Sequence, residues 1–253
     1  LGDGLYRVGE SNDLPRGKYA GVAPGANLTA QSLYNGPYFF RNLTRWSVLH
    51  NADISQNSWG ADNASLWGKY TLDSREYDNA TRDADWLTDG NQSILVVFSA
   101  GNDGLGGNDS ISTTATGKNI ITVGAVGNDK FGLGSGTVWA MSSRGPTDDG
   151  RIKPDLVAPG DLVVSTWATL DTGTSGSVPG DGGTHSYIGY GGTSMAAPIV
   201  SGASALVIDH LRRIDGHSDP SPALVKAVLI ASADHLTTEA WPGNGQGWGR
   251  VNV

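Results

Sequence analysis

The sequence predicts one α/β domain over residues 1–253, with a largely parallel β-sheet covered by helices on both faces. Short apolar runs of strand length alternate with helical patterns along the chain, which is the order expected of a parallel sheet. The strongest run, "SILVVFSA", is nearly continuous in apolar residues, as buried parallel strands are. With 253 residues, the chain is long enough to enclose a full core in a single domain.

Six short segments are predicted as strands. In chain order they are Asn27–Tyr34, Ala52–Trp59, Ser93–Ala100, Asn119–Val126, Asp161–Ala168 and Ser186–Tyr190. Gly-rich stretches such as "GLGGNDS" and "DTGTSGSVPGDGG" are expected to be surface loops rather than linkers between domains.

Four helices are predicted, over Leu43–Asn51, Ser74–Asp89, Ser194–Ile214 and Pro222–Ala233. The third has apolar residues at three- and four-residue spacing, with Pro198 expected in its first turn and Gly216 as its stop. The fourth has Ser221 as its cap and Pro222 at the first helical position, which is a strong start signal.

Composition excludes several classes of protein. The net charge of −8 disfavours a nucleic-acid binder, which would carry a basic face. No apolar run reaches the length of a membrane span, so no membrane association is expected. Cysteine is absent, which excludes disulfides, thiolate metal sites and a cysteine nucleophile.

The sequence contains six N-x-S/T sequons, which begin at Asn27, Asn42, Asn63, Asn79, Asn91 and Asn108. This number favours a secreted or extracellular protein, in which such asparagines can be glycosylated. Loops with a high content of Ser, Thr and Asn give the same pattern, so both interpretations stay open.

Ser194 lies at the start of the third predicted helix, in "YGGTSMAAPIV". Unpaired N–H groups and the positive end of the helix dipole can stabilise negative charge at this place. Position alone leaves two interpretations open: a serine N-cap after a glycine turn, and a catalytic nucleophile.

Asn102 follows the predicted strand Ser93–Ala100, and Ser58 lies at the end of the predicted strand Ala52–Trp59. Both are thus at the side of a parallel sheet where ligands bind. The Asn102 carboxamide could donate a hydrogen bond to a developing oxyanion, or it could be a turn residue before Asp103-Gly104. The segment Ser58-Trp59-Gly60 could offer its backbone edge to an extended peptide.

Six sequence blocks together resemble one family. They are "GVAPGANL", "NSWG", "SAGNDG", "SSRGPTDDGRIKPDLVAPG", "GTSMAAP" and "GQGWGRVNV". From Gly21 to Val253 these blocks resemble, in the same order, those of the subtilisin-like serine proteases. The fourth block and the "GWGRV" ending look most like alkaline bacterial subtilases that carry a C-terminal β-domain.

The resemblance implies a three-layer α/β/α fold and hydrolysis of peptide bonds. Ser194 takes the place of the nucleophile, and its backbone N–H joins the Asn102 side chain as the oxyanion hole. Ser58, Trp59 and Gly60, together with Ser99, Ala100 and Gly101, match the segments that flank the bound peptide and line its first specificity pocket. Trp59 and the absence of an acid in Thr113–Gly117, the expected pocket floor, favour large uncharged side chains before the cleaved bond.

The chain departs from the family at its beginning. Subtilases carry the catalytic Asp and His in two blocks before the "GVAP" segment, but the twenty residues before Gly21 contain no histidine. We therefore expect both residues upstream of Leu1 and a fold that is incomplete in its N-terminal part. A gap in the sheet is expected beside Ala52–Trp59 or Asn27–Tyr34, and the segment is expected to be inactive by itself.

Two tripeptides could be mistaken for the absent residues. Asp171–Gly173 and Gly183–His185 precede Ser194 in the family's order, but both lie in one loop between two predicted strands. A solvated loop is the favoured interpretation. An alternative function is a pseudoprotease or peptide-binding domain on the same scaffold, but such a domain needs neither Ser194 nor Asn102.

No cofactor is expected to be required for the chemistry. Subtilases often bind structural calcium, and Asp3, Glu10, Asn12 and Asp13 lie in the stretch that matches a calcium-binding loop of some members. Their spacing is not that of a calcium loop, which favours ordinary solvation, and we assign no metal ligands.

Overall fold

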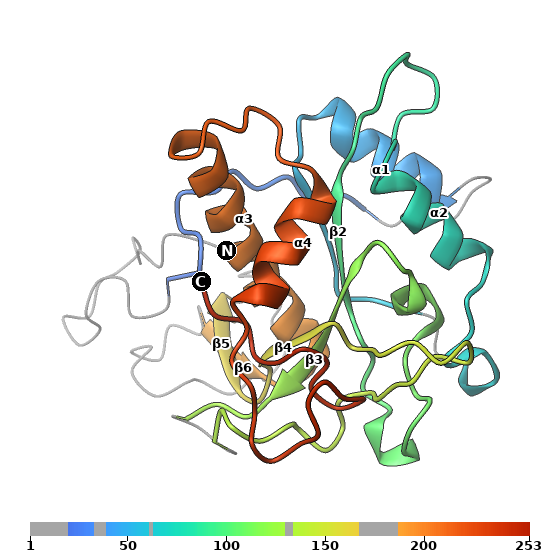
Figure 1. The fold of residues 1–253 in the computed structure, drawn as a ribbon, viewed down its shortest axis with the longest axis vertical. Coiled ribbons are helices and arrows are strands. Elements are labelled where there is room, and N and C mark those ends of the chain that lie inside the picture. Colours follow the sequence, from blue (N-terminus) through green and yellow to red (C-terminus); the bar gives the residue numbers. More distant parts are fainter. Residues whose placement is uncertain (1–19, 33–38, 61–62, 130–133, 167–186) are drawn as a thin grey trace.

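The computed structural model describes residues 20–32, 39–60, 63–129, 134–166 and 187–253 (Figure 1). A parallel sheet of four strands lies between two layers of helices. α3 (Thr193–Arg213) and α4 (Pro222–Ala231) pack on one face, and α1 (Phe39–Leu49) and α2 (Leu72–Ala80) lie on the other. The predicted three-layer α/β/α fold with a largely parallel sheet is confirmed.

The sheet has the order β1 (Ile54–Asn57), β2 (Leu95–Ser99), β3 (Ile121–Val126) and β4 (Leu156–Pro159), and every pair is parallel. All residues of β2 and β3 are buried, which explains their continuous apolar sequence. β5 (Val163–Thr166) and β6 (Tyr187–Tyr190) form a separate antiparallel pair. Three short 3-10 helices lie at η1 (Ala64–Leu66), η2 (Gly104–Gly106) and η3 (Thr113–Thr116).

Helix α3 is the central element of the core. It packs against all four strands and runs antiparallel to them, because Ser194 at its start contacts Ser58 after β1, while Arg212 at its end pairs with Asp53 before β1. Among the described helices, α3 alone is long and apolar enough to cross a membrane. More than half of that apolar stretch is buried between the sheet and α4, which is the position of a core helix.

The predicted strand Asn27–Tyr34 is wrong over its described part, since residues 27–32 belong to no strand. A strand needs a hydrogen-bonded neighbour, and β1 is the edge of the sheet on this side. A groove of about 1120 Å³ is lined by Ala23–Thr29 and Gln31 on one side and by β1 on the other. Among the described residues, no strand pairs with the outer edge of β1.

The fourth sheet strand was not predicted. The sheet uses Leu156–Pro159, whereas the predicted segment Asp161–Ala168 contributes β5, which pairs only with β6. Pro154 lies two residues before β4 and Pro159 is its last residue, and these two prolines obscure its strand pattern. Residues 167 and 168 lie outside the described part of the chain.

The helices differ from their predicted bounds mainly at α2. It ends at Ala80 instead of Asp89, because the side chains of Asp83 and Asp85 accept hydrogen bonds from backbone N–H groups and stabilise a turn. α1 begins four residues earlier than expected and α4 ends two residues earlier. Ser221 caps α4 as predicted, since its side chain accepts from the Leu224 N–H at 3.3 Å.

Candidate active site

Ser194 is the second residue of α3, so it lies in the first turn as predicted. The N-cap position belongs to Gly192, which makes no side-chain cap bond, and the interpretation of Ser194 as a helix cap is therefore wrong. Pro198 is the sixth residue of the helix and not part of its first turn, which also corrects the sequence-based expectation.

The loops after β1, β2 and β4 converge on this helix start. Ser58 follows β1 and contacts Ser194, Asn102 follows β2 and contacts Thr193, and Gly160 follows β4 and accepts a hydrogen bond from the Gly192 N–H at 2.7 Å. The carboxyl ends of parallel strands meet at one edge of the sheet, which is where such folds bind ligands. The structure thus brings together the separate segments that the sequence singled out.

Thr193 fixes the orientation of the Asn102 carboxamide. Asn102 Oδ1 accepts hydrogen bonds from the Thr193 backbone N–H at 2.9 Å and from Thr193 Oγ1 at 3.1 Å. With its oxygen held, the exposed side chain leaves Nδ2 as a donor without a partner among the described residues. Sequence reasoning missed Thr193, although its place directly before Ser194 was a signal.

Two donors meet in the space beside Gly192. A Cβ atom at residue 192 would lie 3.6 Å from Asn102 Nδ2, 3.6 Å from the backbone nitrogen of Ser194 and 3.5 Å from Asn102 Oδ1. That nitrogen also makes no hydrogen bond within the described residues. Gly192 has a φ of +152°, which disfavours other residues, and its missing side chain keeps this space open. Two neighbouring donors that have no partner within the described residues are suited to holding an oxyanion.

The Trp59 ring turns away from Ser194 into the apolar cluster beneath α1 and α2. It stacks on Phe40 with ring centroids 5.6 Å apart, and it meets Phe98 edge-on at 5.4 Å. Ser58 and Gly60 on either side of it are exposed, whereas Ser99 and Ala100 are buried and Gly101 is half-buried. The backbone around Trp59 thus remains open to a ligand.

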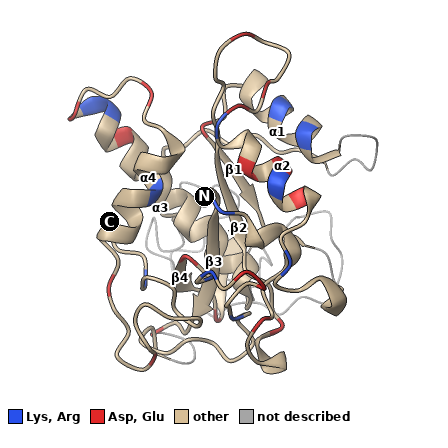
Figure 2. Cartoon of the chain, turned by 45° about the vertical axis from the view of Figure 1, so that its right-hand side comes forward, with Lys and Arg blue, Asp and Glu red and all other residues tan. Residues whose placement is uncertain are grey.

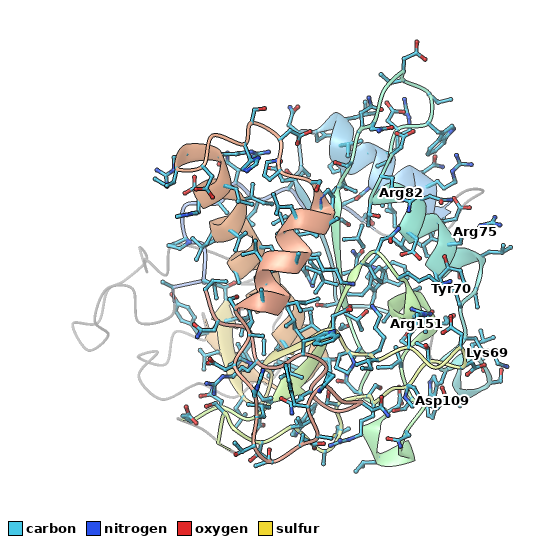
Figure 3. All side chains as sticks on the ribbon, in the orientation of Figure 1. Lys69, Tyr70, Arg75, Arg82, Asp109 and Arg151 are labelled. Atoms are coloured by element: carbon cyan, nitrogen blue, oxygen red, sulfur yellow. The ribbon has the colours of Figure 1, made fainter. Side chains whose placement is uncertain are left out.

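A polar network holds the segment Thr113–Gly117 against the rest of the fold. The carbonyl of Lys69 accepts from Thr113 Oγ1 and Thr116 Oγ1 at 3.0 and 2.9 Å, and Arg151 donates to the Thr116 carbonyl at 2.7 Å. Figure 3 shows Lys69 and Arg151 near Tyr70 on this side of the molecule. Burial and a hydrogen bond to Asp78 raise the pKa of Tyr70 to about 12. The buried side chains of the segment itself are all uncharged.

A buried charge cluster anchors the chain ahead of β4. Lys153 Nζ donates to Asp155 at 2.6 Å and to Thr122 Oγ1 at 2.7 Å, while Lys226 from α4 reaches the other oxygen of Asp155 at 2.9 Å. Two amines share one carboxylate here, and burial lowers the pKa of Lys153 to about 7. Burial alone would raise the pKa of Asp155, but Lys153 and Lys226 lower it on balance.

The immediate surroundings of Ser194 carry no charged residue in "NSWG", "SAGN" or "GTSM". Figure 2 shows Lys and Arg on α1 and α2 instead, where Arg41 and Arg45 pair with Glu76 and Asp85. In the described part of the chain, Ser194 Oγ has one hydrogen-bond partner, the carbonyl of Ser58 at 3.5 Å.

No described histidine contacts Ser194. His50 stacks on Trp46, His235 stacks on Trp241, and His210 lies near Asp215 at the far end of α3. His217 bonds to the Leu211 carbonyl through its backbone. The two decoy tripeptides, Asp171–Gly173 and Gly183–His185, lie outside the described residues.

Asp3, Glu10, Asn12 and Asp13 also lie outside the described residues. Within residues 20–32, 39–60, 63–129, 134–166 and 187–253, no three His, Cys, Asp or Glu side chains gather in a way that could hold a metal ion.

Comparison with known proteins matches this chain to subtilases by family model, by sequence and by structure. The model of the Subtilase family matches residues 8–249. Serine protease AprX of Bacillus subtilis is 30% identical over 262 residues, which covers 97% of this chain and 54% of AprX. Subtilisin E of the same species is 29% identical and covers 89% of this chain and 48% of its own length.

The chain therefore spans about half the length of the curated relatives it matches. Among solved structures, the prenylagaramide maturation protease PagA superposes with a TM-score of 0.56 at 21% identity, over 89% of this chain and 68% of PagA. At this identity the likeness concerns the fold.

Proposed function

Because this chain belongs to the subtilase family, we propose that it forms most of the catalytic domain of a serine endopeptidase. The single observation that carries the proposal is the convergence of two unpaired donors, Asn102 Nδ2 and the Ser194 N–H, on the space beside Gly192. A peptide-binding module would need neither donor, whereas acyl transfer needs both.

In the proposed mechanism, Ser194 Oγ attacks the carbonyl carbon of the scissile peptide bond. The carbonyl oxygen becomes an oxyanion, which accepts hydrogen bonds from Asn102 Nδ2 and the Ser194 N–H. Thr193 keeps the Asn102 amide turned so that its nitrogen faces the oxyanion. The substrate lies between Ser58-Trp59-Gly60 and Ser99-Ala100-Gly101.

A serine hydroxyl needs a base to become a nucleophile, and that base needs an orienting acid. We propose that both come from residues encoded ahead of Leu1, in a segment that occupies the groove beside β1. This groove supports the proposal because an added strand could pair with the open edge of β1, and because Ser201, Ala205 and Ile208 of α3 form a floor of small and apolar side chains.

The alternative is a pseudoprotease that binds peptides without cleaving them. The absence of a histidine at Ser194 within the described residues favours it. The orientation of Asn102 by Thr193 opposes it, since a binding domain gains nothing from a donor held toward an empty space.

Two further features of the protein are proposed. Substrates carry an uncharged side chain before the cleaved bond, because the buried residues Thr113–Thr116 are neutral.

The protein is also proposed to be secreted. All six sequon asparagines are exposed, as glycosylation would require, and the test is whether the protein is found in the culture supernatant of its source.

The test of the proposed function is hydrolysis by the protein encoded by the whole gene. An internally quenched peptide library should be cleaved, with preference for uncharged residues before the cut, and Ser194→Ala should abolish turnover. Ser204→Ala is the matched control, since it removes a buried serine hydroxyl from the same helix outside the groove. If the wild-type protein and Ser194→Ala both bind peptides and neither cleaves them, the pseudoprotease is favoured.

A further inference from the structure

Near its start, helix α3 contains a carbonyl that lacks the usual N–H partner four residues later. In an α-helix, the carbonyl of residue i accepts from the N–H of residue i+4. The partner of the Ser194 carbonyl would be residue 198, which is proline and has no N–H. The residue at the proposed nucleophilic position is thus the one whose backbone is released from the helical ladder.

A side chain from another element takes the place of the missing N–H. The hydroxyl of Ser58 donates to the Ser194 carbonyl at 2.7 Å, across 136 positions of sequence. The contact is reciprocal, since Ser194 Oγ donates to the Ser58 carbonyl at 3.5 Å. The residue after β1 and the second residue of α3 are therefore joined in both directions.

The Gln56 side-chain amide also contacts the Ser58 hydroxyl, at 2.6 Å. With its nitrogen toward Ser58, Gln56 donates and leaves the hydroxyl proton for the Ser194 carbonyl. With its oxygen toward Ser58, the amide instead accepts from the backbone N–H groups of Asn57 and Ser58 and competes for the same proton. In the first orientation the Ser58 hydroxyl joins β1 to the start of α3. In the second, its single proton goes either to Gln56 or to the Ser194 carbonyl.

From this geometry we infer that the Ser58 side chain is a positioning residue for the nucleophile. The inference rests on the proposed function. By bonding the carbonyl that Pro198 releases, Ser58 fixes the backbone of Ser194 and thereby the direction of its Oγ. The Ser58 backbone flanks the substrate, so removal of the hydroxyl alone should leave substrate binding intact.

The test is a kinetic comparison in the full-length protein. Ser58→Ala should lower kcat about tenfold, which is the effect of losing one hydrogen bond, with little change in KM. The rate of labelling of Ser194 by a fluorophosphonate should fall by the same factor. Ser58→Thr keeps a hydroxyl and should restore most of both rates. Ser65→Ala removes an exposed hydroxyl far from α3 and is the matched control.

A double-mutant cycle with Pro198→Ala separates positioning from general damage. Alanine at 198 supplies the N–H that the Ser194 carbonyl lacks, so Ser58→Ala should cost less than about twofold in that background. An equal loss in both backgrounds, or a rise in KM with unchanged kcat, would overturn the inference. If Ser58→Ala does not fold, Ser58→Thr becomes the test. A Ser58→Thr protein that lacks most of the wild-type kcat and labelling rate would then overturn the inference. A wild-type protein that neither cleaves peptides nor labels at Ser194 would count against the proposed function itself.

Discussion

At the scale of single residues, the site depends on how one amide group is turned. Thr193 donates two hydrogen bonds to the Asn102 side-chain oxygen, and Nδ2 has no partner within the described residues. A donor fixed in this way needs no reorganisation when charge develops on the substrate, which is why such groups contribute strongly to catalysis.

Replacing Asn102 by leucine should therefore remove transition-state stabilisation without altering substrate binding. We expect Asn102→Leu to lower kcat about 100-fold, with KM changed by less than about threefold. Steady-state kinetics on one good peptide substrate measure both. The exposed Asn91→Leu is the control, and equal effects of the two substitutions would contradict the assigned role of Asn102.

The buried amine of Lys153 makes a second residue-scale prediction, on the pH dependence of stability. Its pKa is about 7 in the folded chain and 10.5 when exposed. Between these values the unfolded state binds more protons, so the free energy of unfolding should rise with pH, by at most about 1.4 kcal/mol per unit. This contribution is lost as the pH falls toward 7.

Urea unfolding at pH 7 to 9.5 measures this slope. Lys153→Met should flatten it, while Lys226 still pairs with Asp155. Above pH 10 the raised pKa of Tyr70 acts in the opposite sense, because the folded chain then holds the proton that the unfolded chain releases. If the free energy of unfolding rises equally with pH in the wild-type protein and in Lys153→Met below pH 9.5, Lys153 stays charged in the folded chain.

At the scale of elements, the sequence predicted a helix or strand best where the signal lay within the element's own residues and did not depend on a neighbouring element. β2 is apolar except for Ser99, and α4 carries its own cap. The strand and the start of the helix were both predicted correctly. β4 was missed because its pairing with β3, and not its four-residue sequence, makes it a strand. The prediction of a strand over residues 27–32 was wrong for the converse reason, since a segment that pairs with no neighbour among the described residues forms no strand.

The same distinction applies to the candidate site. Ser194 and Asn102 were found because each stands in a recognisable block of sequence. The role of Thr193 and the bond from Ser58 to the Ser194 carbonyl depend on three strand ends meeting at one helix, and no local pattern encodes that meeting.

The open edge of β1 gives an element-scale prediction. In residues 1–253 alone, the backbone N–H groups of Ile54–Asn57 that face the groove should exchange with solvent much faster than those of β3, which is paired on both sides. In the full-length protein, an added strand should slow the exchange of β1 toward that of β3. Hydrogen exchange followed by mass spectrometry measures this, and unchanged exchange of β1 would argue against occupation of the groove.

At the scale of the whole molecule, the groove concerns stability as well as catalysis. Residues 1–253 alone forgo the burial and the strand pairing that a segment in the groove would add, against a total stability of only about 5–15 kcal/mol for a domain. Residues 1–253 alone should therefore be unstable and inactive on a peptide amide. Turnover by this segment that Ser194→Ala abolishes would mean that it carries its own base, and His185 would then be the first residue to examine.

The central claim is that Ser194 is the nucleophile of a peptidase, and covalent labelling tests it most directly. The full-length protein is treated with a fluorophosphonate, digested and analysed by mass spectrometry. We expect one adduct, on Ser194, which forms faster than on any other serine and is absent from Ser194→Ala. Cleavage of peptides by a protein whose Ser194 stays unlabelled, or an adduct on another serine, would contradict the claim.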